Sequence, residues 1–262
     1  MIRRLIENHA SQHGFLSRRI VIAAQLYLNA YCSLDNYDMK KNGEYRLLQR
    51  VGPLVSRTMF DVGANIGEWT QAALDCIPSA RIHAFELSPV TASIIKSRFA
   101  SEQNVVVNAC GLSSVSQEVE VLHVDANNSL SGLNDGNSKH KGSKIPGRVI
   151  TGRDYLRDRD IDYIGLLKID TEGHDYEVIA GFAECLRQCQ VIQFEYNEFS
   201  WARGRFIEHF QGLMPHFRIG RLTEGGVLWD RSLISNERIR AGNLIACHKE
   251  RTDLVAALER FQ

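Results

Sequence analysis

Short apolar runs alternate with helical stretches over most of the chain, from residue 58 onward. The six candidate strands are 58–62, 81–86, 105–109, 164–169, 191–196 and 243–248, and the clearest helical stretches between them are 67–76, 90–101 and 176–189. Alternation at this spacing predicts parallel βαβ units, whose right-handed crossovers place helices on both faces of one sheet. We therefore expect residues 58–262 to form an α/β domain with a doubly wound, mostly parallel sheet.

Residues 1–57 have a different pattern and read as helical. Their apolar side chains fall on helix faces, and a turn at Asn42-Gly43 begins a second helix that ends near Gly52-Pro53. We expect this segment to be an N-terminal helical cap that packs on the α/β domain, rather than a separate domain.

The longest apolar stretch of that segment, residues 20–31, is interrupted by Gln25 and Asn29. It is too short and too polar to span a bilayer, and no signal-peptide cleavage pattern stands out. Arginines at positions 3, 4, 18 and 19 precede it. Peripheral membrane contact therefore stays open as an alternative to packing on the domain.

Charge and cysteine content narrow the class of protein. The chain has 31 basic and 31 acidic side chains and a formal net charge of zero, whereas a dedicated nucleic-acid binder needs a basic excess. The six cysteines form no C-x-x-C pair, which disfavours a zinc or redox site. We expect no nucleic-acid partner and a reducing, cytoplasmic location. The oligomeric state is open, with a homodimer as one alternative.

Residues 111–150 interrupt the strand–helix rhythm. Residues 118–124 alternate like an exposed strand, and residues 125–147 are rich in Asn, Ser, Gly and Lys. A polar loop of this length in a compact domain is either functional or disordered. The basic side chains of this region allow a lid over an acceptor, beside the simpler reading of a solvated loop; they are Lys139, His140, Lys141, Lys144 and Arg148.

A glycine-containing loop follows the first candidate strand and precedes the next helix. It places Asp61, Gly63 and Gly67 in the pattern D-x-G-x-x-x-G, with Asn65 between the glycines. Glycines let the backbone turn tightly and approach a ligand, and the helix N-terminus offers free N–H groups. The loop is therefore a candidate ligand site, although such turns also join strands to helices without a ligand.

Glu86 closes the second candidate strand, directly before Leu87. A carboxylate at that position can accept hydrogen bonds from both hydroxyls of a ribose. The chain has neither the G-x-G-x-x-G of dinucleotide-binding folds nor the G-x-x-x-x-G-K of phosphate-binding loops. A nucleoside-like cofactor without phosphates therefore fits better than a nucleotide di- or triphosphate.

Three ionisable residues, Asp170, Glu172 and His174, follow the fourth candidate strand. Ligands of open α/β sheets bind at the carboxyl ends of the strands, so these side chains are expected at a reaction centre. A polar cap of the next helix would explain Asp170 or Thr171 alone. Three such groups within one short segment favour a functional role.

Four strings carry a resemblance to a known family; they are residues 59–67 (MFDVGANIG), Phe85-Glu86, Asn108-Ala109-x-Gly111 and residues 167–173 (LKIDTEG). Over residues 42–197 the chain resembles the FkbM-type S-adenosylmethionine-dependent methyltransferases, and K-I-D-x-E-G is the most specific string. The resemblance implies a Rossmann-like class I methyltransferase fold with a seven-stranded sheet. It also implies S-adenosyl-L-methionine as cofactor and a hydroxyl oxygen on a sugar, glycan or polyketide as acceptor, without naming that acceptor.

The same resemblance implies cofactor contacts from Asp61, Gly63, Asn65, Gly67, Glu86, Leu87, Asn108, Gly111 and Asp170. The glycine loop would lie beside the methionine end, Glu86 would hold the ribose, and the turn from Asn108 to Ser113 would border the adenine. The acidic adenine partner that is frequent in related methyltransferases is absent here, and Ser113 is the candidate to replace it.

Methyl transfer to an alcohol requires alignment of the oxygen with the S–CH₃ bond and benefits from a proton acceptor. His174 is the first candidate base because its unperturbed pKa lies near neutral pH; Asp170 and Glu172 are alternative bases, or orient the histidine. We expect no metal. The candidate ligand set, if Mg²⁺ is used, is Asp170, Glu195 and Asn197, which would present three oxygens.

Two other functions stay open. A methyltransferase-like module without activity could bind a partner through its N-terminal helices, although it would not need Glu86, Asp170, Glu172 and His174 together. A nicotinamide-dependent oxidoreductase is the second alternative, and the missing G-x-G-x-x-G pattern counts against it.

Overall fold

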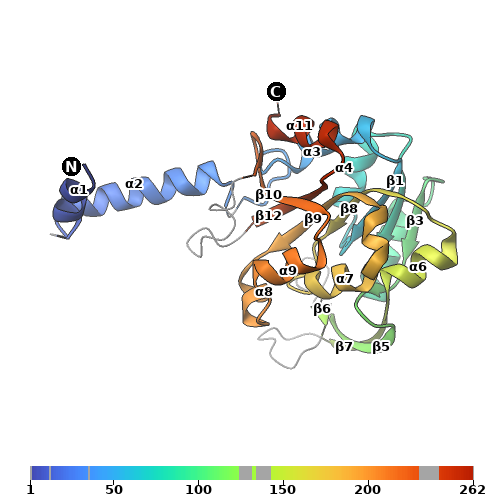
Figure 1. Cartoon of the computed structure of the whole chain (residues 1–262). Coiled ribbons are helices and arrows are strands. Elements are labelled where there is room, and N and C mark those ends of the chain that lie inside the picture. The colour runs from blue at the N-terminus through green and yellow to red at the C-terminus, as the bar shows by residue number, and fades with distance from the viewer. Residues whose placement is uncertain are drawn as a thin grey trace.

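The computed structural model describes residues 2–11, 13–34, 36–123, 132–133, 143–229 and 242–261. An eight-stranded sheet forms the centre of the α/β domain (Figure 1). Its strands are β1 (Thr58–Val62), β2 (Arg81–Phe85), β3 (Val105–Asn108), β8 (Ile164–Ile169), β9 (Cys189–Tyr196), β10 (Phe217–Thr223), β11 (Gly226–Leu228) and β12 (Gly242–His248).

The order of the strands is β11-β10-β12-β9-β8-β1-β2-β3. Neighbours from β9 to β3 are parallel, whereas β12 lies antiparallel between β9 and β10. The doubly wound, mostly parallel sheet that the sequence predicts is confirmed. It has one strand more than the expected seven, because the chain turns back after β10 and adds β11 as the second strand of an antiparallel hairpin.

Helices cover both faces of the sheet because the side chains of each strand alternate between two cores. In β1, Phe60 and Val62 belong to one core and Met59 to the other. The first core includes residues of α6 (Gly152–Arg159), α7 (Asp175–Phe182) and α9 (Ile207–Leu213), and the second includes residues of α3 (Glu44–Val51), α4 (Glu68–Cys76), α5 (Pro89–Arg98) and α11 (Thr252–Glu259). The remaining short elements are the 3₁₀ turns Gly52–Leu54 and Ala183–Gln188 and helix α8 (Glu198–Ala202).

A second, four-stranded sheet interrupts the strand–helix rhythm where the sequence predicts a break. Its strands are β4 (Gly111–Leu112), β5 (Gln117–His123), β6 (Gly132–Leu133) and β7 (Ser143–Ile150), in the order β4-β7-β5-β6. The alternating strand predicted over residues 118–124 is β5, and the end of the expected loop, from Ser143 on, is part of β7. Lys139, His140 and Lys141 of the hypothesised lid lie outside the described residues.

The N-terminal helices differ from the expected cap. α1 (Ile2–Ala10) and α2 (Phe15–Tyr31) extend away from the domain (Figure 1), and Ser17 is the buried residue of α2. The predicted packing of α2 on the domain is therefore wrong in this structure, because its apolar side chains face solvent. α3, in contrast, buries Leu47, Leu48 and Val51 completely in the second core. The division at residue 57/58 stays a prediction.

Candidate active site

The carboxyl ends of β1, β2, β8 and β9 carry most of the residues that the sequence singles out. β1 pairs with β2 on one side and with β8 on the other, so the chain winds outward in opposite directions from this point. Ligands of open α/β sheets bind at such a switch point. The loops that follow β1, β2 and β8 meet there and line two neighbouring cavities.

The glycine loop after β1 is pressed against the end of β8. Gly63 has φ +79°, and a Cβ at this position would overlap the carbonyl group of Asp170. Only glycine tolerates both that backbone angle and that approach. Gly67 has φ +82°, and a Cβ there would meet the ring of Phe99. Gly63 therefore shapes the cavities, while the role of Gly67 in this structure is to pack α4 on α5.

Glu86 is held in place by backbone groups of the loops on either side. Its two carboxylate oxygens accept hydrogen bonds from the N–H groups of Asn65 and Ser88, each at 2.9 Å. Burial raises the pKa of Glu86 to about 7, against the opposing effect of these two hydrogen bonds. The carboxylate lines a cavity, called here the Glu86 cavity, together with Leu87, Gly111 and other residues.

The Glu86 cavity has an apolar part and a polar end. Leu87, Leu112 and Val149 supply apolar surface, and Glu172 and His174 line the same space together with Asp170. Burial, reinforced by Asp170 and Asp175, raises the pKa of Glu172 to about 7. A half-buried carboxyl that titrates near neutral pH is able to exchange a proton under physiological conditions.

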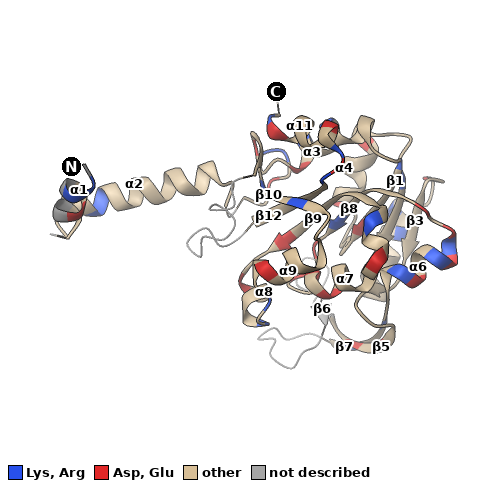
Figure 2. Ribbon diagram, viewed as in Figure 1, with Lys and Arg blue, Asp and Glu red and all other residues tan. Residues whose placement is uncertain are grey.

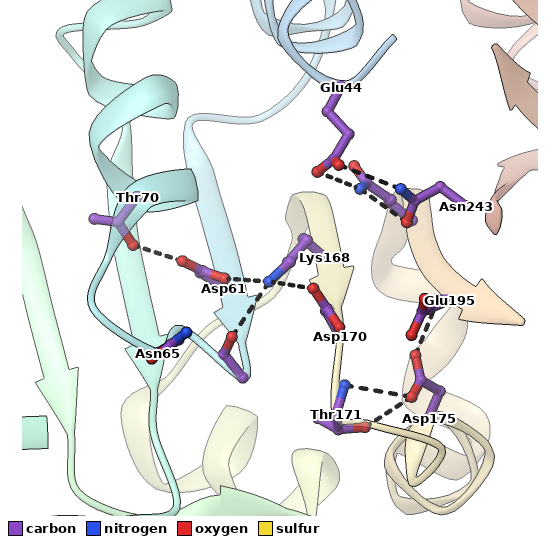
Figure 3. A network of polar contacts seen from close by, with 12 residues as sticks. Glu44, Asp61, Asn65, Thr70, Lys168, Asp170, Thr171, Asp175, Glu195 and Asn243 are labelled. Carbon is purple, nitrogen blue, oxygen red and sulfur yellow. Dashed lines mark hydrogen bonds and ion pairs between the residues drawn. The ribbon is translucent and has the colours of Figure 1, made fainter. Parts of the chain in front are cut away.

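A buried ion pair fixes the loop after β1 to strand β8 (Figure 3). Lys168 Nζ lies 3.2 Å from Asp61 Oδ1, 3.6 Å from Asp170 Oδ2 and 3.3 Å from the carbonyl oxygen of Gly63. Asp61 is fully buried and also accepts a 2.7 Å hydrogen bond from Thr70. Burial opposes the charge of Lys168, but Asp61 and Asp170 outweigh it and keep the pKa of the lysine above its ordinary value. Asp61 lines neither cavity, so it supports the loop rather than forming a wall.

A second cavity lies on the other side of the glycine loop and is called here the Glu44 cavity. It shares Gly63, Asn65 and Asp170 with the Glu86 cavity. Glu44 is buried within it and accepts hydrogen bonds from Asn42 and Gln193. It also accepts one from Asn243 (Figure 3). Burial raises the pKa of Glu44, and Asn42, Glu195 and Asn243 add further polar groups to the lining.

Sequence reasoning missed several of these buried polar residues. Lys168 entered only as part of a string, and Glu44, Gln193 and Asn243 had no role. A lysine inside the otherwise apolar run 164–169 is the one signal that could have identified a buried pair, because an unpaired lysine is seldom buried. Two of the three partners of Glu44, Gln193 and Asn243, come from the distant strands β9 and β12, so no local pattern connects them to it.

His174 lies where the sequence predicts it and has two polar neighbours. Its Nε2 is 3.0 Å from Ser113 Oγ, and its Nδ1 is 3.7 Å from Glu177 Oε2. Arg205 donates hydrogen bonds of 3.0 and 2.8 Å to the other oxygen of Glu177. Burial lowers the pKa of His174, and Glu177 acts in the opposite direction. The histidine is therefore mainly neutral at neutral pH.

Two of the expected positions are used differently in this structure. The side chain of Asn108 donates to the carbonyl groups of Ala84 and Val106 and accepts a hydrogen bond from Tyr155; it lines neither the Glu86 nor the Glu44 cavity. Asn197 donates to Glu195 at 2.6 Å, and its carbonyl oxygen accepts from the first N–H groups of α8.

The candidate metal ligands are accordingly not arranged as a set. The Asn197 oxygen caps α8, and burial together with Asp170 raises the pKa of Glu195, which favours its uncharged form. Within the described ranges, no group of three or more His, Cys, Asp or Glu side chains has the spacing of a metal site.

Comparison with known proteins places the chain in a family. The model of the methyltransferase FkbM domain matches residues 61–219, which is more than half of the chain. The chain belongs to the FkbM methyltransferase family. S-adenosylmethionine is the cofactor of this family, and therefore of this member of it.

Two curated relatives are similar over part of their length. The hexuronic acid methyltransferase AglP of Haloferax volcanii is 27% identical over 140 residues, which are 52% of this chain and 54% of that protein. The 31-O-demethyl-FK506 methyltransferase FkbM of Streptomyces tacrolimicus is 29% identical over 184 residues, which are 59% of this chain and 70% of that protein. The match thus spans about half of the haloarchaeal relative.

Solved structures to which the chain is similar include an O-methyltransferase from Bacillus cereus in complex with SAH. It is 15% identical with a TM-score of 0.47, and the match covers 87% of this chain and 90% of that one. The O-methyltransferase TomG from Streptomyces achromogenes, in complex with SAM, is 12% identical with a TM-score of 0.46, covering 86% and 89%.

The chemistry of the Glu86 cavity fits this cofactor. The apolar part formed by Leu87, Leu112 and Val149 suits an adenine ring, and the fixed carboxylate of Glu86 suits a ribose diol. Gly63 lines both cavities and has no side chain, so only its backbone lies at their junction. A Cβ there would overlap the carbonyl group of Asp170. No phosphate-binding pattern is present in the sequence, as a cofactor without phosphates requires.

Lys168→Met should destabilise the protein strongly, because it leaves Asp61 buried without its cation. We expect a loss of about 3–5 kcal/mol in the free energy of unfolding, measured by urea denaturation. The double variant Asp61→Asn, Lys168→Met should recover part of that loss. Lys144→Met, which removes an exposed pair with Glu120, is the matched control and should cost less than about 1 kcal/mol. Equal effects of the two single lysine variants would contradict the proposed role of the buried pair.

Proposed function

We propose that this FkbM methyltransferase transfers the methyl group of S-adenosylmethionine to a hydroxyl oxygen of a sugar, glycan or polyketide-like acceptor. The observation that carries the proposal is the group Asp170, Glu172 and His174 at the end of β8, in the same cavity as Glu86. The names of the two curated relatives, one a hexuronic acid methyltransferase and the other a methyltransferase of demethyl-FK506, support this acceptor class. Six free cysteines support a reducing, cytoplasmic location.

The residues that would hold the cofactor follow the strands β2, β1 and β8. Glu86 would accept hydrogen bonds from the ribose hydroxyls, Leu87 and Gly111 would border the adenine, and Gly63 and Asn65 would lie beside the methionine end. Asp61 contributes indirectly, by holding Lys168 and the loop in position. The sulfonium group, when bound, supplies an activated methyl group, so the protein mainly has to align the acceptor oxygen with it.

The acceptor hydroxyl reaches the junction where Gly63, Asn65 and Asp170 line both cavities. We assign His174 as the base that takes the hydroxyl proton at Nε2, since burial keeps its ring mainly neutral. Glu177, 3.7 Å from Nδ1, orients the ring and stabilises the protonated form, a role that the sequence had left to Asp170 or Glu172. Glu172, with a pKa raised to about 7, is the alternative base, together with Asp170.

Calorimetric titration with S-adenosylhomocysteine and with NAD(H) tests the proposal against its alternatives. We expect saturable binding of the homocysteine nucleoside and none of the nicotinamide cofactor, because the site has a ribose carboxylate but no phosphate-binding loop. Binding of NAD(H) alone would favour an oxidoreductase. Binding of neither would favour a module without activity.

The affinity for S-adenosylhomocysteine should depend on pH through Glu86. A carboxylate accepts ribose hydrogen bonds in its charged form, so affinity should be full above the pKa of about 7 and fall by about tenfold per pH unit below it. Glu86→Ala should weaken binding roughly ten- to a hundredfold at pH 8. Glu86→Gln should remove the pH dependence. A dependence that persists in Glu86→Gln would assign it to another group, such as Glu172.

His174→Ala should lower kcat by about 10²- to 10⁴-fold and leave the affinity for S-adenosylhomocysteine unchanged. An acceptor found by screening sugar and macrolide alcohols provides the assay.

Glu177→Gln removes the charge that raises the pKa of His174, so the acid limb of the kcat profile should move to lower pH. Glu208→Gln, an exposed acid on α9, should leave the profile unchanged. An unchanged profile in Glu177→Gln would exclude the positioning role.

A further inference from the structure

Helix α2 exposes apolar side chains around most of its circumference. Phe15, Val21, Leu26 and Tyr27 are each more than 60% exposed, and Leu16, Ile20, Ile22 and Tyr31 are also exposed. A helix that is apolar on nearly all sides is normally buried in a protein core or in a membrane. An exposed apolar surface of this extent marks an interaction site.

The polar positions of α2 form a narrow stripe. Arg18, Gln25 and Asn29 are spaced seven and four residues apart, which places them on one side of a helix, and Gln25 donates a 2.6 Å hydrogen bond to Asn29. The other sides carry aliphatic and aromatic residues apart from Ser17, which is buried, and Arg19, which lies over the ring of Phe15. This arrangement suits a helix that lies along an interface with one edge facing water.

Charge distinguishes the N-terminal helices from the rest of the chain. α2 contains no Asp or Glu, and residues 2–31 hold four arginines and one glutamate, a formal charge of +3 in a chain whose net charge is zero. The arginines gather in α1 and at the start of α2, and the remainder of α2 is uncharged (Figure 2). The single acid, Glu7, is paired with Arg3.

We propose that α1 and α2 bind the surface of a bilayer that contains anionic lipids. The apolar sides of α2 enter the boundary between headgroups and acyl chains, and Arg4, Arg18 and Arg19 contact lipid phosphates. Across the described residues no helix is long and apolar enough to cross a membrane, so α2 lies along the surface. The methyltransferase domain, which projects from the end of α2 (Figure 1), is thereby held beside the membrane.

A second copy of the chain is a less suitable occupant of this surface. Pairing two α2 helices would bring together two segments of the same positive charge, and neither segment offers an acid to the arginines of the other. Like charges at an interface disfavour association. An anionic lipid surface has the complementary charge as well as the apolar depth that α2 requires.

Flotation of the full chain with lipid vesicles tests the proposal. We expect the protein to float with vesicles of phosphatidylcholine and phosphatidylglycerol, and much less with phosphatidylcholine alone or at high salt. Ile20→Glu with Leu26→Glu should reduce the bound fraction by more than about tenfold, because two charges replace side chains that enter the membrane. Arg18→Glu with Arg19→Glu should abolish the preference for the anionic lipid.

The matched control places two glutamates on exposed apolar positions of the domain. Val115→Glu with Tyr163→Glu should float like the unchanged protein. Binding of S-adenosylhomocysteine by all variants shows that the domain remains folded and keeps the result separate from the proposed catalytic function. Absence of flotation with anionic vesicles, or equal flotation of the Ile20→Glu, Leu26→Glu variant, would overturn the proposal. Self-association that depends on α2, without flotation, would overturn it in favour of a second copy.

Discussion

The buried pair between Lys168 and Asp61 is the interaction on which the rest of the site depends. It joins β8 to β1 at the point where the sheet changes direction, and the same ammonium group contacts the carbonyl oxygen of Gly63. The loop after β1 is therefore tied to the end of β8, which also carries Asp170, Glu172 and His174. Desolvation of the two charges offsets much of their attraction, whereas removal of one partner is strongly destabilising. We therefore assign the pair the role of holding the loop after β1 against β8. It sets the distance between the glycine loop after β1 and the proposed reaction centre.

The carboxyl and imidazole groups around this pair are held in different protonation states by their surroundings. Burial brings Glu86 and Glu172 to pKa values of about 7, and it lowers the pKa of His174. The Glu86 cavity thus contains two carboxyl groups that titrate near neutral pH and an imidazole that is mainly neutral. Such an arrangement suits a positively charged sulfonium donor and a neutral alcohol. Methyl transfer turns the sulfonium into a neutral thioether, and the hydroxyl proton of the alcohol then needs an acceptor.

Much of the domain could be predicted from the periodicity of apolar residues, because each strand is marked by residues within it and directly beside it. The strands β1, β8 and β9 are apolar runs bounded by turn residues, so their positions agree with the structure to within two residues. β10 was missed because Arg218 and Arg221 interrupt its apolar pattern; Arg221 is fully buried in the fold. The seven-strand expectation omitted β11, a three-residue strand that forms a hairpin with β10 and is too short to give a periodic pattern. The position of α2 could not be predicted either, since an apolar helix gives no sign of whether protein or lipid covers it.

Sequence patterns predicted the site residues that directly follow a strand. They did not predict residues that lie further along a helix or on distant strands. Glu86, Asp170, Glu172 and His174 all line the Glu86 cavity. Glu177, whose carboxylate faces His174, lies one helical turn further along and resembled any surface acid in the sequence.

The most direct test of the central claim is a crystal structure with S-adenosylhomocysteine. The account predicts ribose hydroxyls within hydrogen-bond distance of Glu86 and the sulfur beside Asp170; a nucleoside bound away from Glu86 would contradict it.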